Sequence, residues 1–250
     1  MRFTDPLLEG RFLRRYKRFF ADVQLDGRTV VAHVPNTGTM RGAMRAGCAC
    51  RLSYNDNPKR KLRYTLEMLR PGAVWVGVNT GLANHLVGEA WRQRSVDRWK
   101  VLDRAEAEVK VSSDSRLDWV MWRSRPGLIS RDDLRAADLR HCGPLHFVEV
   151  KNVSLAENDV ALFPDAVSTR AAKHMAELVN LVRLGHTAEV VFTVQRSDAS
   201  RFAPADQLDP EYGRALRRAA RAGVRISPYS CRVRRDGIKM QGGTLLEVEL

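Results

Sequence analysis

The chain has 250 residues, of which 44% are hydrophobic and 28% are charged, a composition typical of soluble globular proteins. This length suits one large domain or two small ones, and no apolar run is long enough to cross a membrane. The 42 Lys and Arg residues outnumber the 29 Asp and Glu residues and give a formal net charge of +13, which predicts a polyanionic partner.

The first twenty residues predict a cytoplasmic protein. Asp5 and a basic aromatic stretch stand where a signal peptide would need an uninterrupted apolar segment. Cys48 and Cys50 are two positions apart, Cys142 and Cys231 are isolated, and none of the spacings is that of a zinc site. We therefore expect reduced and mostly buried thiols.

Residues 1–81 read as short strands separated by turns, which predicts a small β-barrel. The predicted strands are FLRRYKRFFADVQL, RTVVAHV, CACRLSYN and GAVWVGVN, with a turn at Asp26-Gly27. Two basic segments suggest contacts with nucleic acid. They comprise Arg14, Arg15, Tyr16, Lys17 and Arg18 in the first strand and Lys59, Arg60 and Lys61 in a later loop.

The first basic segment alternates cations with aromatic residues. On one continuous strand, Tyr16, Arg18 and Phe20 share a face, and Lys17 and Phe19 share the other. At least one aromatic side chain is then expected in the core rather than in a binding face. For the loop at 59–61, a solvated basic loop without a partner is an equally good interpretation.

Residues 82–250 predict an α/β layer. GLANHLVGEAWRQR, TRAAKHMAELVNLVRLG and PEYGRALRRAARAG have helical spacing, and the second of these should bury Ala172, Met175, Val179 and Val182. Strands are expected at AEVKVS, RLDWVMW, LHFVEVKNV, AEVVFTV and VRISPYS, with a polar excursion over 124–143.

Two of these strands place acids in apolar surroundings, at Asp118 and at Glu149. Neighbouring strands could bring the two carboxylates together, as Mg²⁺ or Mn²⁺ requires, and the backbone carbonyl of Val150 could complete the set. Lys151 would then orient a water molecule or offset charge on a phosphate. The alternative is a strand-surface ion pair worth about 0.2–1 kcal/mol, since a Glu-x-Lys spacing is common.

The helix that follows the Glu149 strand offers a polar face. Arg170, Lys173, His174 and Glu177 would flank a phosphate backbone bound at the acids, although a solvated helix face has the same pattern.

Eight stretches in order resemble the sugar fermentation stimulation protein A family over nearly the whole chain. They are YKRFFADV, PNTGTM, DNPKRK, VNTGLAN, SRLDW, FVEVKNVSL, FPDAVSTRAAKHMAEL and SRFAPA. The resemblance implies an OB-fold barrel followed by a PD-(D/E)XK nuclease-like domain, DNA binding, and a role in regulating genes of sugar use. Position by position it implies a catalytic set of Asp118, Glu149, Lys151 and Glu108. The segment before LHFVEVKNV is longer than the family pattern leads us to expect.

The sequence thus predicts a fold with an OB-like barrel at 1–81 and a restriction-endonuclease-like mixed-sheet α/β domain at 82–250. The expected function is that of a DNA-binding protein with a nuclease-type metal site, a candidate Mg²⁺-dependent phosphodiesterase on single- or double-stranded DNA. A non-catalytic DNA-binding regulator on the same scaffold is the first alternative, because fold does not decide activity. An RNA-binding protein is the second, because both polymers offer phosphates.

Overall fold

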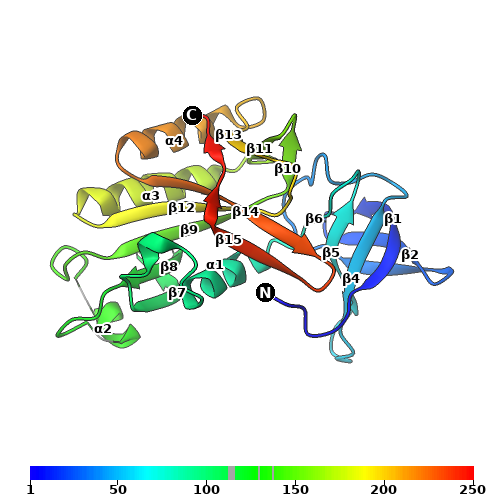
Figure 1. Cartoon of the computed structure of the whole chain (residues 1–250), viewed down its shortest axis with the longest axis horizontal. Coiled ribbons are helices and arrows are strands. Elements are labelled where there is room, and N and C mark those ends of the chain that lie inside the picture. Colours follow the sequence, from blue (N-terminus) through cyan, green and yellow to red (C-terminus); the bar gives the residue numbers. More distant parts are fainter. Residues whose placement is uncertain (112–115, 129, 137) are drawn as a thin grey trace.

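The computed structural model describes residues 1–111, 116–128, 130–136 and 138–250 (Figure 1). The N-terminal strands form a barrel at one end of the molecule, and the rest of the chain forms a larger sheet with helices packed on it (Figure 1). This arrangement confirms the predicted fold class.

The barrel is built from six strands in the order β3-β2-β1-β4-β5-β6, and an additional pairing of β3 with β5 closes it. The strands are β1 (Leu8–Tyr16), β2 (Phe20–Leu25), β3 (Arg28–His33), β4 (Ala49–Tyr54), β5 (Tyr64–Arg70) and β6 (Val76–Gly77). Side chains of alternate residues in β2 are buried, as the period of a strand with one core face requires. The barrel has its own apolar core around Phe12, Val23 and Leu52.

The predicted first strand is in fact a hairpin. Lys17 and Arg18 have left-handed φ angles of 45° and 63°, so β1 ends at Tyr16 and β2 begins at Phe20. Tyr16 pairs with Phe20 across the turn, and their rings stack with centroids 5.6 Å apart. The side chains of Lys17, Arg18 and Phe19 therefore do not alternate as predicted. The turn was not predicted because the sequence has no Gly or Asn there.

Strand β5 was not predicted from the sequence. Its five central residues, Thr65 to Leu69, are all buried, so the strand lacks the alternation that reveals a half-exposed strand. The buried stretch also includes Glu67, which accepts hydrogen bonds from Ser53 and Asn79. Because a charged residue interrupts this short buried run, the sequence pattern does not indicate a strand.

The main sheet of the second part has the order β15-β14-β12-β9-β8-β7. Its strands are β7 (Arg104–Lys110), β8 (Arg116–Trp122), β9 (His146–Val153), β12 (Thr187–Val194), β14 (Arg225–Arg234) and β15 (Gly237–Leu245). Strand β12 runs parallel to β9 and β14, and the outer pairs are antiparallel. The mixed sheet agrees with the prediction.

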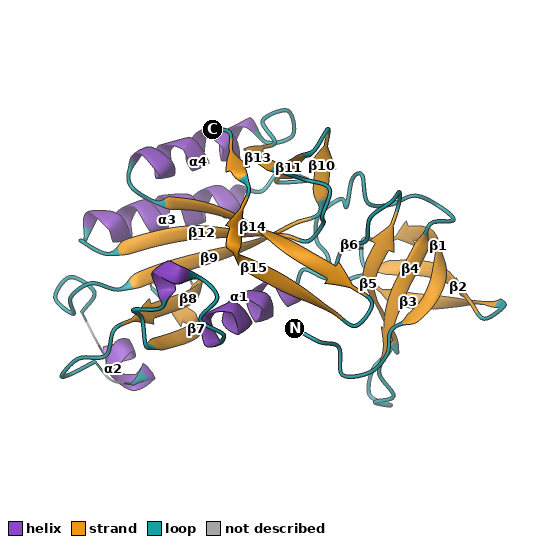
Figure 2. Cartoon of the chain, in the orientation of Figure 1, coloured by secondary structure: helices purple, strands orange, loops and turns teal. Residues whose placement is uncertain are grey.

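Helices cover both faces of this sheet (Figure 2). The helix α1 (Leu82–Arg92) packs on one face with Val148 and Val150, whereas α3 (Thr169–Arg183) and α4 (Pro210–Arg221) pack on the other with Phe147. The side chains of β9 therefore alternate between two apolar layers, as expected. Two short helices, η1 (Asp97–Trp99) and α2 (Arg131–Ala136), lie in the connections, α2 within the predicted excursion.

A second, small sheet was not predicted. It has the order β10-β11-β13-β16, formed by β10 (Leu155–Glu157), β11 (Val160–Phe163), β13 (Arg201–Pro204) and β16 (Glu247–Val248). These strands have two to four residues each, too few for a periodic pattern. The small sheet carries the segment 155–168 beside the barrel, where Asp165 contacts Thr39 and Met40.

The buried face of α3 differs from the predicted one by about one residue. Ala171, His174, Met175, Leu178 and Leu181 are buried, whereas Ala172, Val179 and Val182 are only partly buried. The prediction counted apolar residues and so excluded His174, whose partner lies in the sheet. No helix in the described part of the chain is both long and apolar enough to cross a membrane.

Candidate functional site

The two predicted acids meet at one end of the β8–β9 pair. Trp119 pairs with Val148, so Asp118, one residue earlier, and Glu149, one residue later, lie at the same end. Asp118 Oδ2 accepts a hydrogen bond of 2.7 Å from the backbone N–H of Val150. The loop between the strands separates these residues in sequence, and the antiparallel register brings them together.

Asp118 is held at both of its oxygens. In addition to the Val150 N–H, the side-chain amide of Asn84 in α1 donates to Oδ1 over 2.8 Å. Burial, together with the nearby charge of Glu149, raises the pKa of Asp118 to about 6, although both hydrogen bonds lower it. The two carboxylates thus repel each other, and a divalent cation between them would relieve that repulsion.

The two carboxylate oxygens of Glu149 have different surroundings. Its side chain is 2% exposed, and Oε1 accepts hydrogen bonds from Lys151 Nζ, at 2.5 Å, and from His174 Nδ1. Burial would raise the pKa of Glu149, but the His174 hydrogen bond and the charge of Lys151 outweigh it, so this pKa lies below its usual value. Oε2 is buried and has no hydrogen-bond partner. An unpartnered carboxylate oxygen in this position costs free energy unless a ligand binds it.

The donor set fits a hard divalent cation. Asp118 and Glu149 supply carboxylate oxygens, and Mg²⁺ is commonly held by one or two carboxylates with water and substrate phosphates completing its shell. Within the described ranges, no group of three or more His, Cys, Asp and Glu side chains could hold a metal ion by itself. The site therefore suits a cation whose remaining ligands come from water and substrate. The contribution of the Val150 carbonyl stays a prediction.

Glu108 lies at the rim of the same site. It lines a cavity of about 270 Å³ together with Asp118, Glu149 and Lys151. Its carboxylate is exposed and lies 3.7 Å from Arg116 of β8. Its φ of 56° within β7 is in the left-handed region, which is rare for a residue other than Gly and typical of functional sites.

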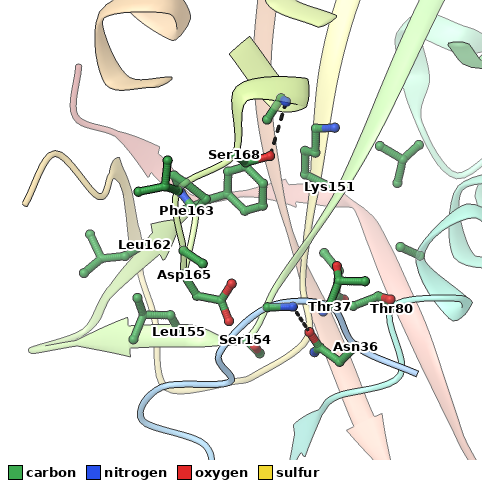
Figure 3. Close-up of a pocket in the computed structure, with 18 of the residues that line it drawn as sticks. Asn36, Thr37, Thr80, Lys151, Ser154, Leu155, Leu162, Phe163, Asp165 and Ser168 are labelled. Atoms are coloured by element: carbon green, nitrogen blue, oxygen red, sulfur yellow. Dashed lines mark hydrogen bonds between the residues drawn. The ribbon is translucent and has the colours of Figure 1, made fainter. Parts of the chain in front are cut away.

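A larger cavity of about 500 Å³ adjoins the site on the side of the barrel (Figure 3). Its walls come from the barrel, from α1, from the small sheet and from the start of α3. The two cavities share five lining residues, which are Asp118, Val150, Lys151, Ser168 and Ala171. The acids thus stand at the junction of two open spaces.

The basic residues predicted in the barrel have separate positions. Arg18 lines the larger cavity from the hairpin turn. Arg15 is occupied, because its guanidinium donates to the carbonyls of Asn36, at 2.6 Å, and Gly38, at 2.8 Å. Arg14 is 74% exposed and pairs with Asp22, and its guanidinium lies 5.4 Å from the ring centroid of Tyr16. Lys17 is exposed in the turn. Of this segment, the structure brings only Arg18 to the site.

The loop at 59–61 lies away from the acids. Lys59 and Lys61 are exposed, Arg60 donates to the Thr65 hydroxyl over 3.2 Å, and none of the three lines either cavity. Binding of nucleic acid by this loop stays a prediction.

On α3, Arg170 lines the smaller cavity and Lys173 is exposed. His174 lines the same cavity, so its predicted contact with a bound phosphate backbone stays a prediction. Its residue is 8% exposed and its ring contacts Glu149, because the helix turns this position toward the sheet. His174 therefore belongs to the support of the acids.

Asn84 and the supporting role of His174 were not predicted from the sequence. Asn84 stands between buried Ala83 and Leu86 on an otherwise apolar helix face, so a polar residue next to core positions was the available signal. Its Oδ1 is buried without a hydrogen-bond partner. For His174 the sequence offered no such signal, because its neighbours Arg170, Lys173 and Glu177 suggest a solvated face.

Comparisons with known proteins agree with the geometry. Residues 13–78 match the family description "SfsA N-terminal OB domain", and residues 81–237 match "Sugar fermentation stimulation protein RE domain". A sugar fermentation stimulation protein homolog from Bdellovibrio bacteriovorus is 44% identical over 92% of both chains, and one from Geotalea uraniireducens is 42% identical over 97% of both. The solved structure of Pyrococcus furiosus SfsA in complex with Ca²⁺ is similar with a TM-score of 0.84 and 26% identity, covering 100% of this chain and 98% of the other.

Proposed function

The chain belongs to the sugar fermentation stimulation protein family, and from that premise we propose that it is a DNA-binding protein with a divalent-metal phosphodiesterase site. The observation that carries the proposal is the asymmetry of Glu149. One oxygen is fixed by Lys151 and His174, and the other is buried and unpartnered. Burial and the charge of Glu149 together raise the pKa of the neighbouring Asp118. The family's link to regulation of sugar-use genes belongs to the same proposal.

Asp118, Glu149 and the carbonyl of Val150 would hold the cation, either Mg²⁺ or Mn²⁺. The binding of Ca²⁺ by the Pyrococcus furiosus relative supports a site for hard divalent cations in this fold. When bound, the cation would supply a water molecule of lowered pKa and would polarise the phosphate. Asn84 and the Val150 N–H would keep the Asp118 carboxylate oriented toward it.

Lys151 would act on the attacking water and the phosphate. Its ammonium lies 2.5 Å from Glu149 Oε1 and lines both cavities, so it reaches the space where a phosphate would stand. There it would donate hydrogen bonds that orient the water and offset the charge that develops on the phosphate oxygens. This contribution is made in the transition state, so it should affect cleavage more than binding of the metal.

Electrostatics support DNA as the partner. The net charge is +13, and Arg18, Lys151 and Arg170 line the two cavities that meet at the acids. Contacts with phosphates release counterions, so the logarithm of the binding constant should fall linearly with the logarithm of the salt concentration. RNA would meet the same charges and is a comparison in the binding experiment.

The test is calorimetric titration with Mg²⁺ and Mn²⁺ of the wild type and of Asp118→Asn, together with nicking of plasmid and cleavage of single strands. The wild type should bind metal and cleave, Asp118→Asn should do neither, and Lys151→Met should bind metal but cleave about 100-fold more slowly. A wild type that binds no metal at millimolar concentration, or one that binds no DNA at low salt, would refute the proposal.

A DNA-binding regulator without catalysis is the second candidate. It is favoured by the absence, in the ranges described above, of any group of three or more His, Cys, Asp and Glu side chains that could hold a metal ion. This candidate predicts metal-dependent stabilisation and salt-dependent binding of DNA with no cleavage by the wild type. The same titration and nicking assays therefore distinguish the two functions.

A further inference from the structure

The larger cavity joins the barrel to the metal site. The loop at Asn36–Gly38 and Thr80 form the barrel side, whereas Leu155, Leu162 and Phe163 form the opposite side (Figure 3). Lys151 of β9 and Asp118 of β8 line the same space. A volume of about 500 Å³ lies within the range of pockets that hold small ligands.

Both walls of this cavity are fixed to each other. The backbone N–H of Met40 donates to Asp165 Oδ2 over 2.8 Å, and the Thr39 hydroxyl donates to the Asp165 carbonyl over 2.7 Å. Arg15 holds the loop from behind by donating to the Gly38 carbonyl. A Cβ atom at Gly38 would lie 2.1 Å from Asp165 Oδ1, so the close approach of the two segments requires Gly. The cavity is therefore preorganised, with its width set by direct contacts.

The chemistry of the walls suits a nucleobase. Leu155, Leu162 and Phe163 offer apolar surface, and Phe163 is anchored by edge contacts with Phe192 and Tyr212. Thr37 and Thr80 place hydroxyl groups on the other side. A base has flat apolar faces and a polar edge, but within a duplex its faces are stacked and its edge is paired. Only an unpaired base presents both to such a cavity.

Basic side chains line both cavities at the junction, next to the acids. Arg18 lines the larger cavity, Arg116 and Arg170 line the smaller one, and Lys151 belongs to both. A strand that follows these cations would place one phosphate at the acids and the adjoining base in the larger cavity. The same path would have to admit a second strand in a duplex, and the contacts of Asp165 with Thr39 and Met40 close that side.

We propose that the cavity between the barrel and the α/β domain holds one unpaired nucleotide of a DNA strand, so that the protein acts on single-stranded DNA. This inference rests on the proposed function and adds the substrate class. It assigns the barrel loop at Asn36–Gly38 a part in the site: the loop forms the wall that selects an unpaired strand.

The experiment compares binding of a fluorescein-labelled single strand on the order of 15 nucleotides with binding of the same strand in a blunt duplex. Fluorescence anisotropy of the full chain is measured in EDTA, so that no cleavage occurs. We expect the single strand to bind at least about tenfold more tightly than the duplex. Thr37→Trp fills the cavity from an exposed loop position and should lower the affinity for the single strand about tenfold.

The matched control is Thr29→Trp, which changes an exposed threonine of β3 that does not line the cavity. Thr37→Asp and Thr29→Asp form a second pair, in which charge replaces bulk. All four variants should keep the Mg²⁺-induced rise in melting temperature of the wild type, which shows that the fold and the acids are intact. The Thr37 variants should lose affinity for the single strand, and the Thr29 variants should keep it.

Equal binding of the two DNA forms, tighter binding of the duplex, or full affinity in both Thr37 variants would overturn this inference and leave the proposed function standing. Failure of the wild type to bind either form at low salt would overturn both. If one Thr37 variant also loses the Mg²⁺ response, the other Thr37 variant decides the test, since Trp and Asp differ in bulk and charge.

Discussion

Two buried glutamates on adjacent strands of the main sheet have opposite surroundings. Glu189 of β12 is 0% exposed, and both of its oxygens are bonded, by Arg98, by Trp99 Nε1 at 3.0 Å and by His146 Nε2 at 3.1 Å. Glu149 of β9 is also buried, but its Oε2 has no partner. Glu189 lies on the α1 side of the sheet, beside the register of Val148, and Glu149 lies on the α3 side.

The difference separates a carboxylate that supports the fold from one that is open to a ligand. Burial would raise the pKa of Glu189, but hydrogen bonds from His146 and Arg98 lower it to about 2. Its interactions are complete, so a further ligand would have to displace one of them. Lys151 and His174 hold only one oxygen of Glu149, which leaves the other as a buried acceptor without a partner.

The largest expected effect tests the structural member of this pair. Glu189→Gln should lower the free energy of unfolding by about 3–5 kcal/mol, because it leaves the Arg98 guanidinium partly buried without its counter-charge. Urea denaturation measures the change. Mg²⁺ should still stabilise the variant, and loss of that response would contradict the assignment of Glu189 to the fold alone.

Low pH should lower the stability of the fold by protonating the same carboxylate, that of Glu189. A glutamate whose pKa is lowered contributes stability that is complete above its unfolded value, near 4.3, and is lost as pH falls through the folded value of about 2. Arg98 and His146 face Glu189, and both lose their charged partner when Glu189 is protonated. We expect a loss of about 3 kcal/mol between about pH 4.3 and pH 2, measured by denaturation at each pH. Glu189→Gln should lack this part of the acid response.

The sequence predicted the two layers of β9 and the meeting of Asp118 with Glu149, because alternation and strand pairing depend on local pattern. It did not predict which carboxylate oxygen stays unpartnered. That property depends on His174, whose helical neighbours are polar and whose contact lies 25 residues away in the chain. Glu189 was read only as part of an apolar strand, since its partners Arg98 and Trp99 lie in a short connection without periodicity.

The barrel shows the same limit. A small barrel was predicted from short strands separated by turn residues. The hairpin at Lys17 and Arg18 was not predicted because it has no Gly or Asn, and β5, which pairs with β3 to close the barrel, was not predicted because it has no alternation. The cavity wall could not be predicted either, because it depends on a contact between Gly38 and Asp165. These residues are 165 − 38 = 127 positions apart in the sequence. Tertiary contacts of this kind leave no local signal.

Substitution of the second glutamate, Glu149, should have a large effect on the binding of metal. Glu149→Gln removes the charge of the free Oε2, so the affinity for Mg²⁺ should fall about 100-fold, equivalent to about 2.7 kcal/mol. Calorimetric titration measures the affinity. Glu157→Gln, at an exposed position of β10, is the control and should bind Mg²⁺ as the wild type does. Equal affinities in the two variants would contradict the distinction between Glu149 and Glu189.

The smallest expected effect concerns His174, which positions Glu149 without contacting the cation. His174→Ala should lower the affinity for Mg²⁺ about tenfold, equivalent to about 1.4 kcal/mol, because Glu149 loses the hydrogen bond to Oε1 that fixes the direction of Oε2. His174→Asn should restore most of it, since the amide N–H of Asn can occupy the position of Nδ1. His85→Ala, at an exposed position of α1, should leave Mg²⁺ binding unchanged. If His174→Asn and His174→Ala lowered the affinity for Mg²⁺ equally, and the two variants had the same melting temperature, His174 would contribute to packing and not to the orientation of Glu149.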